Sequence, residues 1–454
     1  MYSYLRFIFL SALASSSTIS LAEQLKTQQT PNILLILADD LGYGDLSCQG
    51  ATDMKTPNID RIFKSGIQFK NCYANSTVSS PSRASLLTGC YPDMVGVPGV
   101  IRTNKNDSWG YLSTNARLLP QELKKVNYNT AIIGKWHLGL ETPNTPNERG
   151  FDEFRGFLGD MMDDYYTHLR SGVNYMRINQ KVDNPAGHAT EVFTGWAIDY
   201  LQKQEKSKQP FFLYLAYNAP HDPIQPPKEW HEKVITREKN ITDKRAKIVA
   251  LIEHLDDNIG LVLKQLELSA ELENTLIIFT SDNGGSLEHG ANNGSYRGGK
   301  GDLYEGGIRV PAAIMWRNKI KSGQVLDNMV ILMDLFPTIN EIAGHKSQYP
   351  IDGISLLPLI SGNTQITDER MVCFMRREGK LKYGGLCYYS ARYKQFKIVQ
   401  NTPWEPMQIF DLSTDPYEMN PIDKNENHNY EQLFTQLTNH ISSSGAVPWQ
   451  KISK

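Results

Sequence analysis

The chain has 454 residues, of which 40% are hydrophobic and 21% are charged, and its formal net charge is -2. This length predicts one large domain with a smaller one attached. The nearly neutral charge gives no reason to expect a nucleic acid or an anionic membrane surface as a partner.

The first 22 residues have the pattern of a secretory signal peptide. Arg6 gives a positive start, residues 7–14 form an apolar run too short to span a bilayer, and residues 20–22 are suited to cleavage. No cysteine follows this run, so we expect no lipid anchor, and no other run is long and apolar enough to cross a membrane. We therefore expect an exported chain whose mature form begins near Glu23.

Four apolar runs predict buried strands, and each leads directly into polar or charged side chains. These side chains are, in chain order, Asp39 and Asp40, then Lys135 and His137, then His221, and then Asp282 and Asn283. Helical patterns lie between the runs, the clearest being the apolar stripe from Ile248 to Leu266. Continuous apolar strands that alternate with helices predict a parallel or mixed sheet covered on both faces.

The position of these polar residues predicts a single site. Ligands of open α/β sheets bind beyond the carboxyl ends of the strands. Each residue taken alone has a structural explanation, as a helix cap, a turn or a structural histidine. Their joint occurrence at four strand ends is poorly explained in that way.

The composition changes after about Asp368. Short β-rich segments at 371–378, 386–400 and 406–416 precede an amphipathic helix at about 430–441. We therefore expect a catalytic domain at 23–365 and a C-terminal subdomain at 366–454, with an antiparallel sheet and a packed helix. Five cysteines are present, none with the spacing of a metal site, and Cys373 with Cys387 is a plausible local disulfide.

The segment SSPSRASLLTG at 79–89 places four serines ahead of an apolar helix, with no histidine or acid close by in the sequence. A serine hydroxyl is a poor nucleophile without a neighbouring base. Either the segment is an elaborate helix cap, or one serine is not used as a serine.

Ser79-Ser80-Pro81-Ser82-Arg83, followed by Leu87-Thr88-Gly89, resembles the signature of the formylglycine-dependent sulfatases of the alkaline phosphatase superfamily. In that family the first position is Cys or Ser, which is oxidised to an aldehyde (3-oxoalanine, or formylglycine) whose hydrate is the nucleophile. Other segments resemble further family motifs in the same order: ADDLGYGDLSCQG, GKWHLG, APHDP, SDNGG, RGGKGDLYEGGIRVP and IFDLSTDPYEMN. The resemblance implies an alkaline-phosphatase-like α/β sandwich with a small C-terminal α+β domain.

The resemblance also implies one divalent cation per chain, which the oxygen-rich ligand set indicates to be Ca²⁺. The ligands would be Asp39, Asp40, Ser79, Asp282 and Asn283. Together with Arg83, the cation would hold the sulfate ester and the hydrated aldehyde of residue 79.

The remaining roles implied by the resemblance concern proton transfer and charge. Lys135 would stabilise the charged hydrate. His221 and Lys300 would bind sulfate oxygens and assist departure of the alcohol. His137 would take a proton from the second hydroxyl, so that sulfate is expelled and the aldehyde returns.

Serine at the signature position points to a bacterial protein, because the oxygen-dependent eukaryotic machinery needs Cys whereas some bacteria convert Ser. We therefore expect a periplasmic or secreted sulfatase that requires a Ser-type formylglycine maturase. Exported relatives with this architecture commonly act on sulfated polysaccharides or oligosaccharides, which we expect as the substrate. Candidate selectors of the sugar lie at 102–111, 159–170, 376–385 and 401–407.

Three other functions are alternatives to this one. A phosphoester or phosphonate hydrolase of the same superfamily is the nearest alternative. A carbohydrate-binding relative that is not matured would leave the strand-end lysines, histidines and acids unexplained. A nucleotide-binding loop at RGGKGD is excluded, because Lys300 is followed by Gly rather than Ser or Thr.

Overall fold

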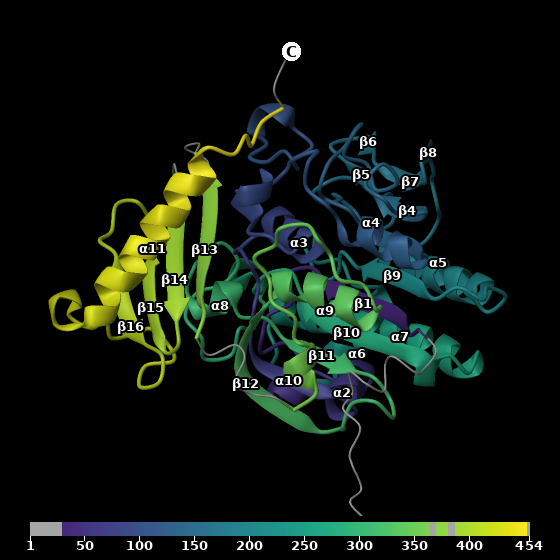
Figure 1. Ribbon diagram of the computed structural model, residues 1–454. Helices are drawn as coiled ribbons and strands as arrows, with labels where there is room; N and C mark the ends of the chain where they lie inside the picture. The colour runs from purple at the N-terminus through teal and green to yellow at the C-terminus, as the bar shows by residue number, and fades with distance from the viewer. Residues whose placement is uncertain (1–29, 363–368, 380–385, 452–454) are drawn as a thin grey trace, which may run out of the picture.

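A mixed ten-stranded sheet forms the centre of the molecule, with strand order β12-β2-β11-β10-β1-β9-β3-β4-β7-β8 (Figure 1). The computed structural model describes residues 30–362, 369–379 and 386–451, so the expected signal peptide lies outside the described residues. The strands of this sheet are β1 (Asn32–Ala38), β2 (Ile67–Tyr73), β3 (Asn129–Lys135), β4 (Glu153–Phe157), β7 (Met176–Ile178), β8 (Lys181–Val182), β9 (Phe211–Ala216), β10 (Thr275–Ser281), β11 (Ala312–Met315) and β12 (Gln324–Ile331). A short hairpin pairs β5 (Leu169–Arg170) with β6 (Val173–Asn174).

Helices cover both faces of this sheet, as the sequence predicts. Side chains along a strand alternate between the two faces, so a fully apolar strand contributes to two cores. Ile33, Leu35 and Leu37 of β1 lie in one apolar core, and Leu34 and Ile36 lie in the other. The first core includes side chains of α3 (Ser79–Thr88), α4 (Leu119–Leu123), α9 (Leu335–Ile342) and α10 (Leu357–Ile360). The second includes side chains of α2 (Pro57–Lys64), α5 (Ala189–Gln204), α6 (Lys228–Arg237) and α7 (Asp243–Leu268), which contains the predicted apolar stripe.

The four predicted strands are present and lie side by side in the order β10-β1-β9-β3. All three pairings among them are parallel, so their carboxyl ends share one edge of the sheet. Ala38, the last residue of β1, is opposite Ser281, the last residue of β10. The acids that follow these two residues are therefore brought together by strand register.

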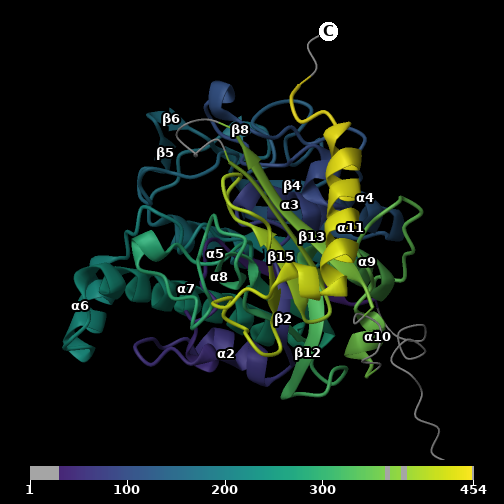
Figure 2. The same ribbon diagram turned by 90° about the vertical axis from the view of Figure 1, so that its left-hand side faces the viewer.

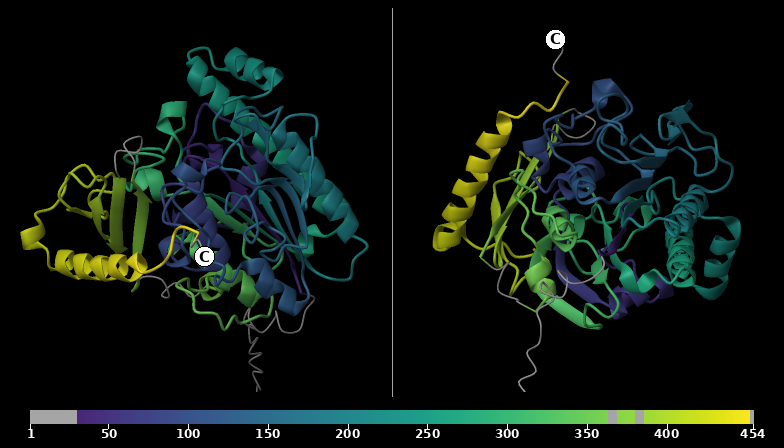
Figure 3. Two further views of the ribbon diagram at one scale, coloured as in Figure 1. Left: turned by 90° about the horizontal axis from the view of Figure 1, so that it is seen from above. Right: turned by 45° about the vertical axis from the view of Figure 1, so that its right-hand side comes forward.

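A second sheet contains β13 (Met371–Glu378), β14 (Leu386–Tyr393), β15 (Phe396–Gln400) and β16 (Gln408–Asp411), all antiparallel (Figure 2). α11 (His428–Gly445) packs along it, with Leu433 and Leu437 in contact with an apolar cluster of the sheet. Figure 3 shows α11 lying along the outside of this sheet. The expected α/β fold with a small C-terminal α+β part is confirmed, and the helix is a few residues longer at each end than predicted.

The expected disulfide between Cys373 and Cys387 is wrong, because all five cysteines are unpaired. In the β13–β14 hairpin Cys373 is opposite Ala391, whereas Cys387 is opposite Arg377. This offset of four residues corresponds to about 13 Å along a strand, beyond the reach of a disulfide.

No helix in the described ranges is long and apolar enough to cross a membrane.

A buried ion-pair cluster joins the small sheet to the main body. The Lys397 ammonium on β15 donates to Glu305 of α8 (Glu305–Ile308) at 2.9 Å and lies 2.8 Å from a carboxylate oxygen of Glu418. All three side chains are fully buried. Burial raises the pKa of Glu305, but the charge of Lys397 and of two arginines outweighs this and lowers the pKa to about 2.

We expect Lys397→Met to lower the free energy of unfolding by roughly 3 to 5 kcal/mol, because it leaves two buried carboxylates without their shared cation. The half-exposed Lys394, on the turn between β14 and β15, is a matched control. Lys394→Met should change this free energy by less than about 1 kcal/mol. Denaturant unfolding of both variants measures the difference, and equal stabilities would contradict a role for the cluster in joining the two sheets.

Candidate active site

The site lies where helix α3 begins beside the carboxyl ends of the central strands. Ser79 is the first residue of α3, and Arg83 follows one turn later on the same side of the helix. Every residue of α3 is buried. The free N–H groups and the positive dipole end of a helix N-terminus favour an anion next to Ser79.

The Ser79 hydroxyl contacts oxygen atoms of the strand-end residues. It donates to Asp39 Oδ1 at 3.0 Å and lies 3.4 Å from Asn283 Oδ1. Neither partner is a histidine, and the other oxygen of Asp39 accepts from the Lys135 ammonium at 2.5 Å. Ser79, Asp39 and Lys135 are all buried.

Arg83 ties the two acidic strand ends to each other. Its Nε donates to Asp282 Oδ2 at 3.0 Å, and its NH2 lies 2.8 Å from the same oxygen as an ion pair. The same NH2 lies 3.5 Å from Asp39 Oδ1. Asp39 and Asp282 thus lie within reach of one guanidinium nitrogen, as a shared site requires.

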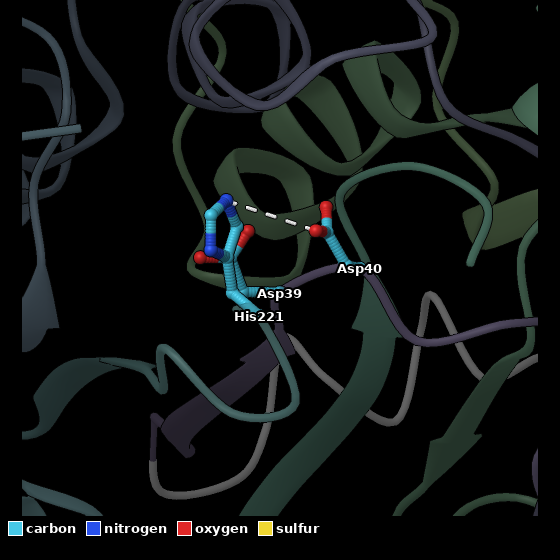
Figure 4. Close-up of side chains that lie close together, drawn as sticks. All are labelled: Asp39, Asp40 and His221. Atoms are coloured by element: carbon cyan, nitrogen blue, oxygen red, sulfur yellow. Dashed lines mark ion pairs between the residues drawn. The ribbon is translucent and has the colours of Figure 1, made fainter. Parts of the chain in front are cut away.

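The second half of the site is built around Asp40. Its Oδ2 accepts from the Lys300 ammonium at 2.7 Å and lies 3.7 Å from His221 Nε2 (Figure 4). Its Oδ1 accepts from the Asn283 amide at 2.8 Å. Lys300 Nζ lies 3.0 Å from His221 Nε2, so these residues form one connected group.

The cations keep the two central acids ionised. Burial raises the pKa of Asp39, but the charge of Lys135, with that of Arg83, holds the pKa well below its usual value. Burial likewise raises the pKa of Asp40, but the charge and hydrogen bond of Lys300 outweigh this effect and lower the pKa. Negative oxygen atoms are therefore available at this edge of the sheet.

His137 has a defined tautomer. Its Nε2 lies 2.9 Å from the Ile101 carbonyl oxygen, which can only accept, so Nε2 carries the proton. Its Nδ1 has no hydrogen-bond partner among the described residues. Burial, and then the charges of Lys135 and Arg83, hold the pKa of His137 well below its usual value. The neutral ring therefore has a free lone pair on Nδ1.

His221 has the opposite tautomer. Its Nδ1 donates to the Asp222 carbonyl oxygen at 2.7 Å, which leaves Nε2 to accept from the Lys300 ammonium. Burial, followed by the charge of Lys300, lowers the pKa of His221. Burial alone would lower the pKa of Lys300, but Asp40 and Asp39 raise it above its usual value. Lys300 is therefore the charged donor of this pair.

The residues at this edge fit a hard divalent cation. Asp39, Asp40 and His221 each offer a ligand atom within 4.8 Å of the others, and Asn283 Oδ1 faces the same hydroxyl as Asp39. Carboxylate and amide oxygens are the ligands that Ca²⁺ and Mg²⁺ prefer. This group of three residues includes His221, which the sequence predicts to act in proton transfer. It does not include Asp282, whose carboxylate oxygens accept from Arg83 and from the Asp40 N–H.

The predicted site residues thus belong to one cluster that is buried except for the partly exposed Lys300, but some of its supports were not predicted. The Ile101 carbonyl oxygen, which sets the His137 tautomer, lies in a loop with no motif of its own. The Tyr165 hydroxyl donates to the Asn218 and His221 carbonyl oxygens at 3.0 and 2.8 Å and fixes the loop that carries His221. Tyr165 falls within 159–170, which the sequence indicates only as a candidate selector of the sugar and not as a support of His221.

The sequence profile of the Sulfatase family matches residues 31–345, and a profile described as N-sulphoglucosamine sulphohydrolase, C-terminal, matches residues 299–446. The first match covers more than half of the chain. The protein belongs to the sulfatase family. This family implies a divalent metal and a formylglycine residue.

Individual relatives agree with this assignment. The N-acetylgalactosamine-6-sulfatase of Homo sapiens is 35% identical over 356 residues, which are 73% of this chain and 66% of that protein. The chain thus spans slightly less than two thirds of the length of this relative. Among solved structures, Ps i-CgsB in complex with k-i-k-neocarrahexaose is 30% identical, with a TM-score of 0.85 over 93% of this chain and 96% of that chain.

A further solved structure is 25% identical, with a TM-score of 0.74 over 91% of this chain and 100% of that chain. Its description concerns the metabolism of multiple glycosaminoglycans by Bacteroides thetaiotaomicron.

Removal of one carboxylate should weaken cation binding. We expect Asp40→Asn, which keeps the shape of the side chain, to lower the affinity for Ca²⁺ at least about ten-fold, because affinity follows the charge of the ligand set. The exposed Asp243 on α7 is the control, and Asp243→Asn should leave the affinity unchanged. Calorimetric titration of the metal-stripped protein with CaCl₂ measures both, and an unchanged affinity in Asp40→Asn would contradict the site.

Proposed function

We propose that this protein hydrolyses sulfate esters of carbohydrates and that residue 79 acts as formylglycine. One observation carries the proposal. The Ser79 hydroxyl lies at a helix N-terminus, and its hydrogen-bond partners are oxygens of Asp39 and Asn283. Arg83 and Lys135 contact Asp39, and Lys300 contacts the adjacent Asp40. The cations would favour a bound anion. The base in contact with the hydroxyl is the Asp39 carboxylate: burial raises its pKa, but Lys135 holds the pKa well below its usual value, so Asp39 is a weak acceptor of the serine proton.

The aldehyde hydrate of residue 79 would supply two hydroxyls, one for attack on sulfur and one whose deprotonation expels the sulfate. Arg83 and Lys135 lie on the side of Ser79 that faces Asp39 and would stabilise the negative charge of the ester. Such charge stabilisation in a buried site is a large contribution to catalysis. The bound Ca²⁺, for which Asp39, Asp40, Asp282 and Asn283 remain the proposed side-chain ligands with residue 79, would add to it.

His137 is suited to act as a base. Its Nε2 proton is held by the Ile101 carbonyl oxygen, and its Nδ1 is free to accept a proton from the second hydroxyl. A depressed pKa keeps the imidazole neutral before the reaction. The neighbouring cations that depress it are the same ones that would hold the sulfate.

Lys300 and His221 are suited to assist the departing alcohol. Lys300 is charged and donates to Asp40, while His221 accepts from it through Nε2. We infer that Lys300 donates to the leaving oxygen and that His221 orients the Lys300 ammonium. This division of roles refines the expectation that both residues act alike.

The proposed substrate is a sulfated polysaccharide or oligosaccharide. It is supported by the N-acetylgalactosamine-6-sulfatase relatives and by Ps i-CgsB, which was crystallised with k-i-k-neocarrahexaose. We further propose export through the segment 1–22, maturation by a Ser-type enzyme, and the division into 23–365 and 366–454. The pattern of the first 22 residues, Ser79 itself and the separate sheets support these three points.

The identity of residue 79 can be tested by substitution. Ser79→Ala should abolish turnover of an aryl sulfate in any host, whereas Ser79→Cys should be active in a host that oxidises Cys. Ser85, on the same helix, is the matched control, and Ser85→Ala should retain most activity because the hydroxyl of Ser85 has no hydrogen-bond partner among the described residues. Turnover by Ser79→Ala would contradict the proposal.

The leaving-group role can be tested with two substrates. Lys300→Met should lower kcat/KM on a sugar sulfate about 10² to 10⁴-fold, but much less on 4-nitrocatechol sulfate, whose leaving group needs little protonation. His221→Ala should show the same contrast with a smaller loss. Steady-state kinetics on both substrates decide the matter, and equal losses would argue that Lys300 binds sulfate without assisting the alcohol.

A further inference from the structure

A pocket of about 420 Å³ lies next to the catalytic cluster and is not used by the proposed chemistry. Its walls come from three segments that are distant in sequence: residues 101–112, 138–144 and 449–451. Figure 1 shows the segment after α11 running back from the small sheet to the main body. The C-terminal subdomain thus contributes directly to a cavity of the catalytic part.

Ile101 connects this pocket to the active site. Its N–H donates to the Ser80 hydroxyl at 3.0 Å, and its carbonyl oxygen accepts from His137 Nε2 at 2.9 Å. Ile101 lines the pocket, as does Leu138, the residue that follows His137. The pocket therefore adjoins residues next to both Ser79 and His137, on the path of a ligand that extends from Ser79 past His137.

The charged side chains of the pocket are mainly basic. Among its described lining residues the cations Lys105 and Lys451 outnumber the single acid, Glu141, whereas the charge of Arg102 is paired with the buried Glu378 at 3.2 Å. Lys105 and Lys451 share this acid, with nitrogen–oxygen distances of 2.9 and 3.4 Å. Both ammonium groups are largely exposed, so either can turn to a bound anion with little change in its own solvation.

The pocket also has a rigid aromatic wall. Trp449 stacks on Trp109, with ring centroids 4.9 Å apart and planes 8° from parallel, and Tyr111 lies in the same wall. Rings of this kind combine an apolar surface with a polar edge. An apolar ring next to cations matches a sugar that has both C–H faces and an acidic substituent.

We propose that this pocket binds a second, anionic sugar unit next to the one that carries the scissile sulfate, which rests on the sulfatase function proposed above. The protein would therefore prefer an oligosaccharide with charge on a neighbouring unit to a small sulfate ester. Lys105, Lys451 and Trp449 would determine this preference without taking part in the reaction.

The test compares kinetic constants of the matured full-length protein on substrates of two sizes. The small substrate is 4-nitrocatechol sulfate, and the larger ones are tetrasaccharides from chondroitin sulfate and carrageenan, with sulfated, uronic or neutral neighbouring units. In the double variant Lys105→Ala, Lys451→Ala we expect KM for the best anionic tetrasaccharide to rise about ten-fold at unchanged kcat, from the loss of two exposed charge interactions. KM for the aryl sulfate should not change.

Two further variants separate the pocket from general effects. Trp449→Ala should raise KM for the same tetrasaccharide, and Lys228→Ala, an exposed lysine on α6 outside the pocket, should not. The inference would be overturned if the tetrasaccharide were cleaved no better than the aryl sulfate, if neutral neighbours served as well as charged ones, or if KM were unchanged in the double variant. Failure of the parent protein on every sulfate ester would instead reject the proposed function.

Discussion

The pairing of buried acids with buried cations at the ends of parallel strands is the interaction on which the site depends. Asp39 lies between Lys135 of β3 and Arg83 of α3, and each pair joins two elements of the fold. A charge in such a place is costly unless it is paired and hydrogen-bonded. The strand ends and the start of α3 are therefore held in one arrangement, and that arrangement places residue 79 against Asp39, which two cations contact.

The rest of the molecule keeps this edge of the sheet in order. Two apolar cores fix the strand register that sets Asp39 beside Asp282. Main-chain carbonyl groups then decide which nitrogen of each histidine carries a proton. The C-terminal sheet is tied to the main body through Lys397, and residues 449–451, which follow α11, line a pocket beside His137. The pocket proposed to determine substrate choice thus draws residues from both parts of the chain.

Much of this arrangement can be predicted from the sequence. The four apolar runs are continuous because both faces of the strands are buried, and parallel strands place their ends at one edge. The polar residues that follow these runs can thus be assigned to one site from the sequence. The histidine tautomers could not be predicted, since they depend on the carbonyl oxygens of Ile101 and Asp222. The prediction of a disulfide between Cys373 and Cys387 was wrong, because the sequence spacing of two cysteines does not give the register of the hairpin that carries them.

The most direct test of the account is the dependence of turnover on the chemical state of residue 79. Preparations that differ in maturation would be compared, with the fraction of aldehyde at residue 79 measured by mass spectrometry and kcat measured per total protein. A plot of kcat against the fraction of aldehyde at residue 79 is predicted to be a straight line through the origin, because only the aldehyde hydrate can release sulfate and begin a new cycle. Appreciable multiple turnover in protein that carries intact Ser79 would contradict it.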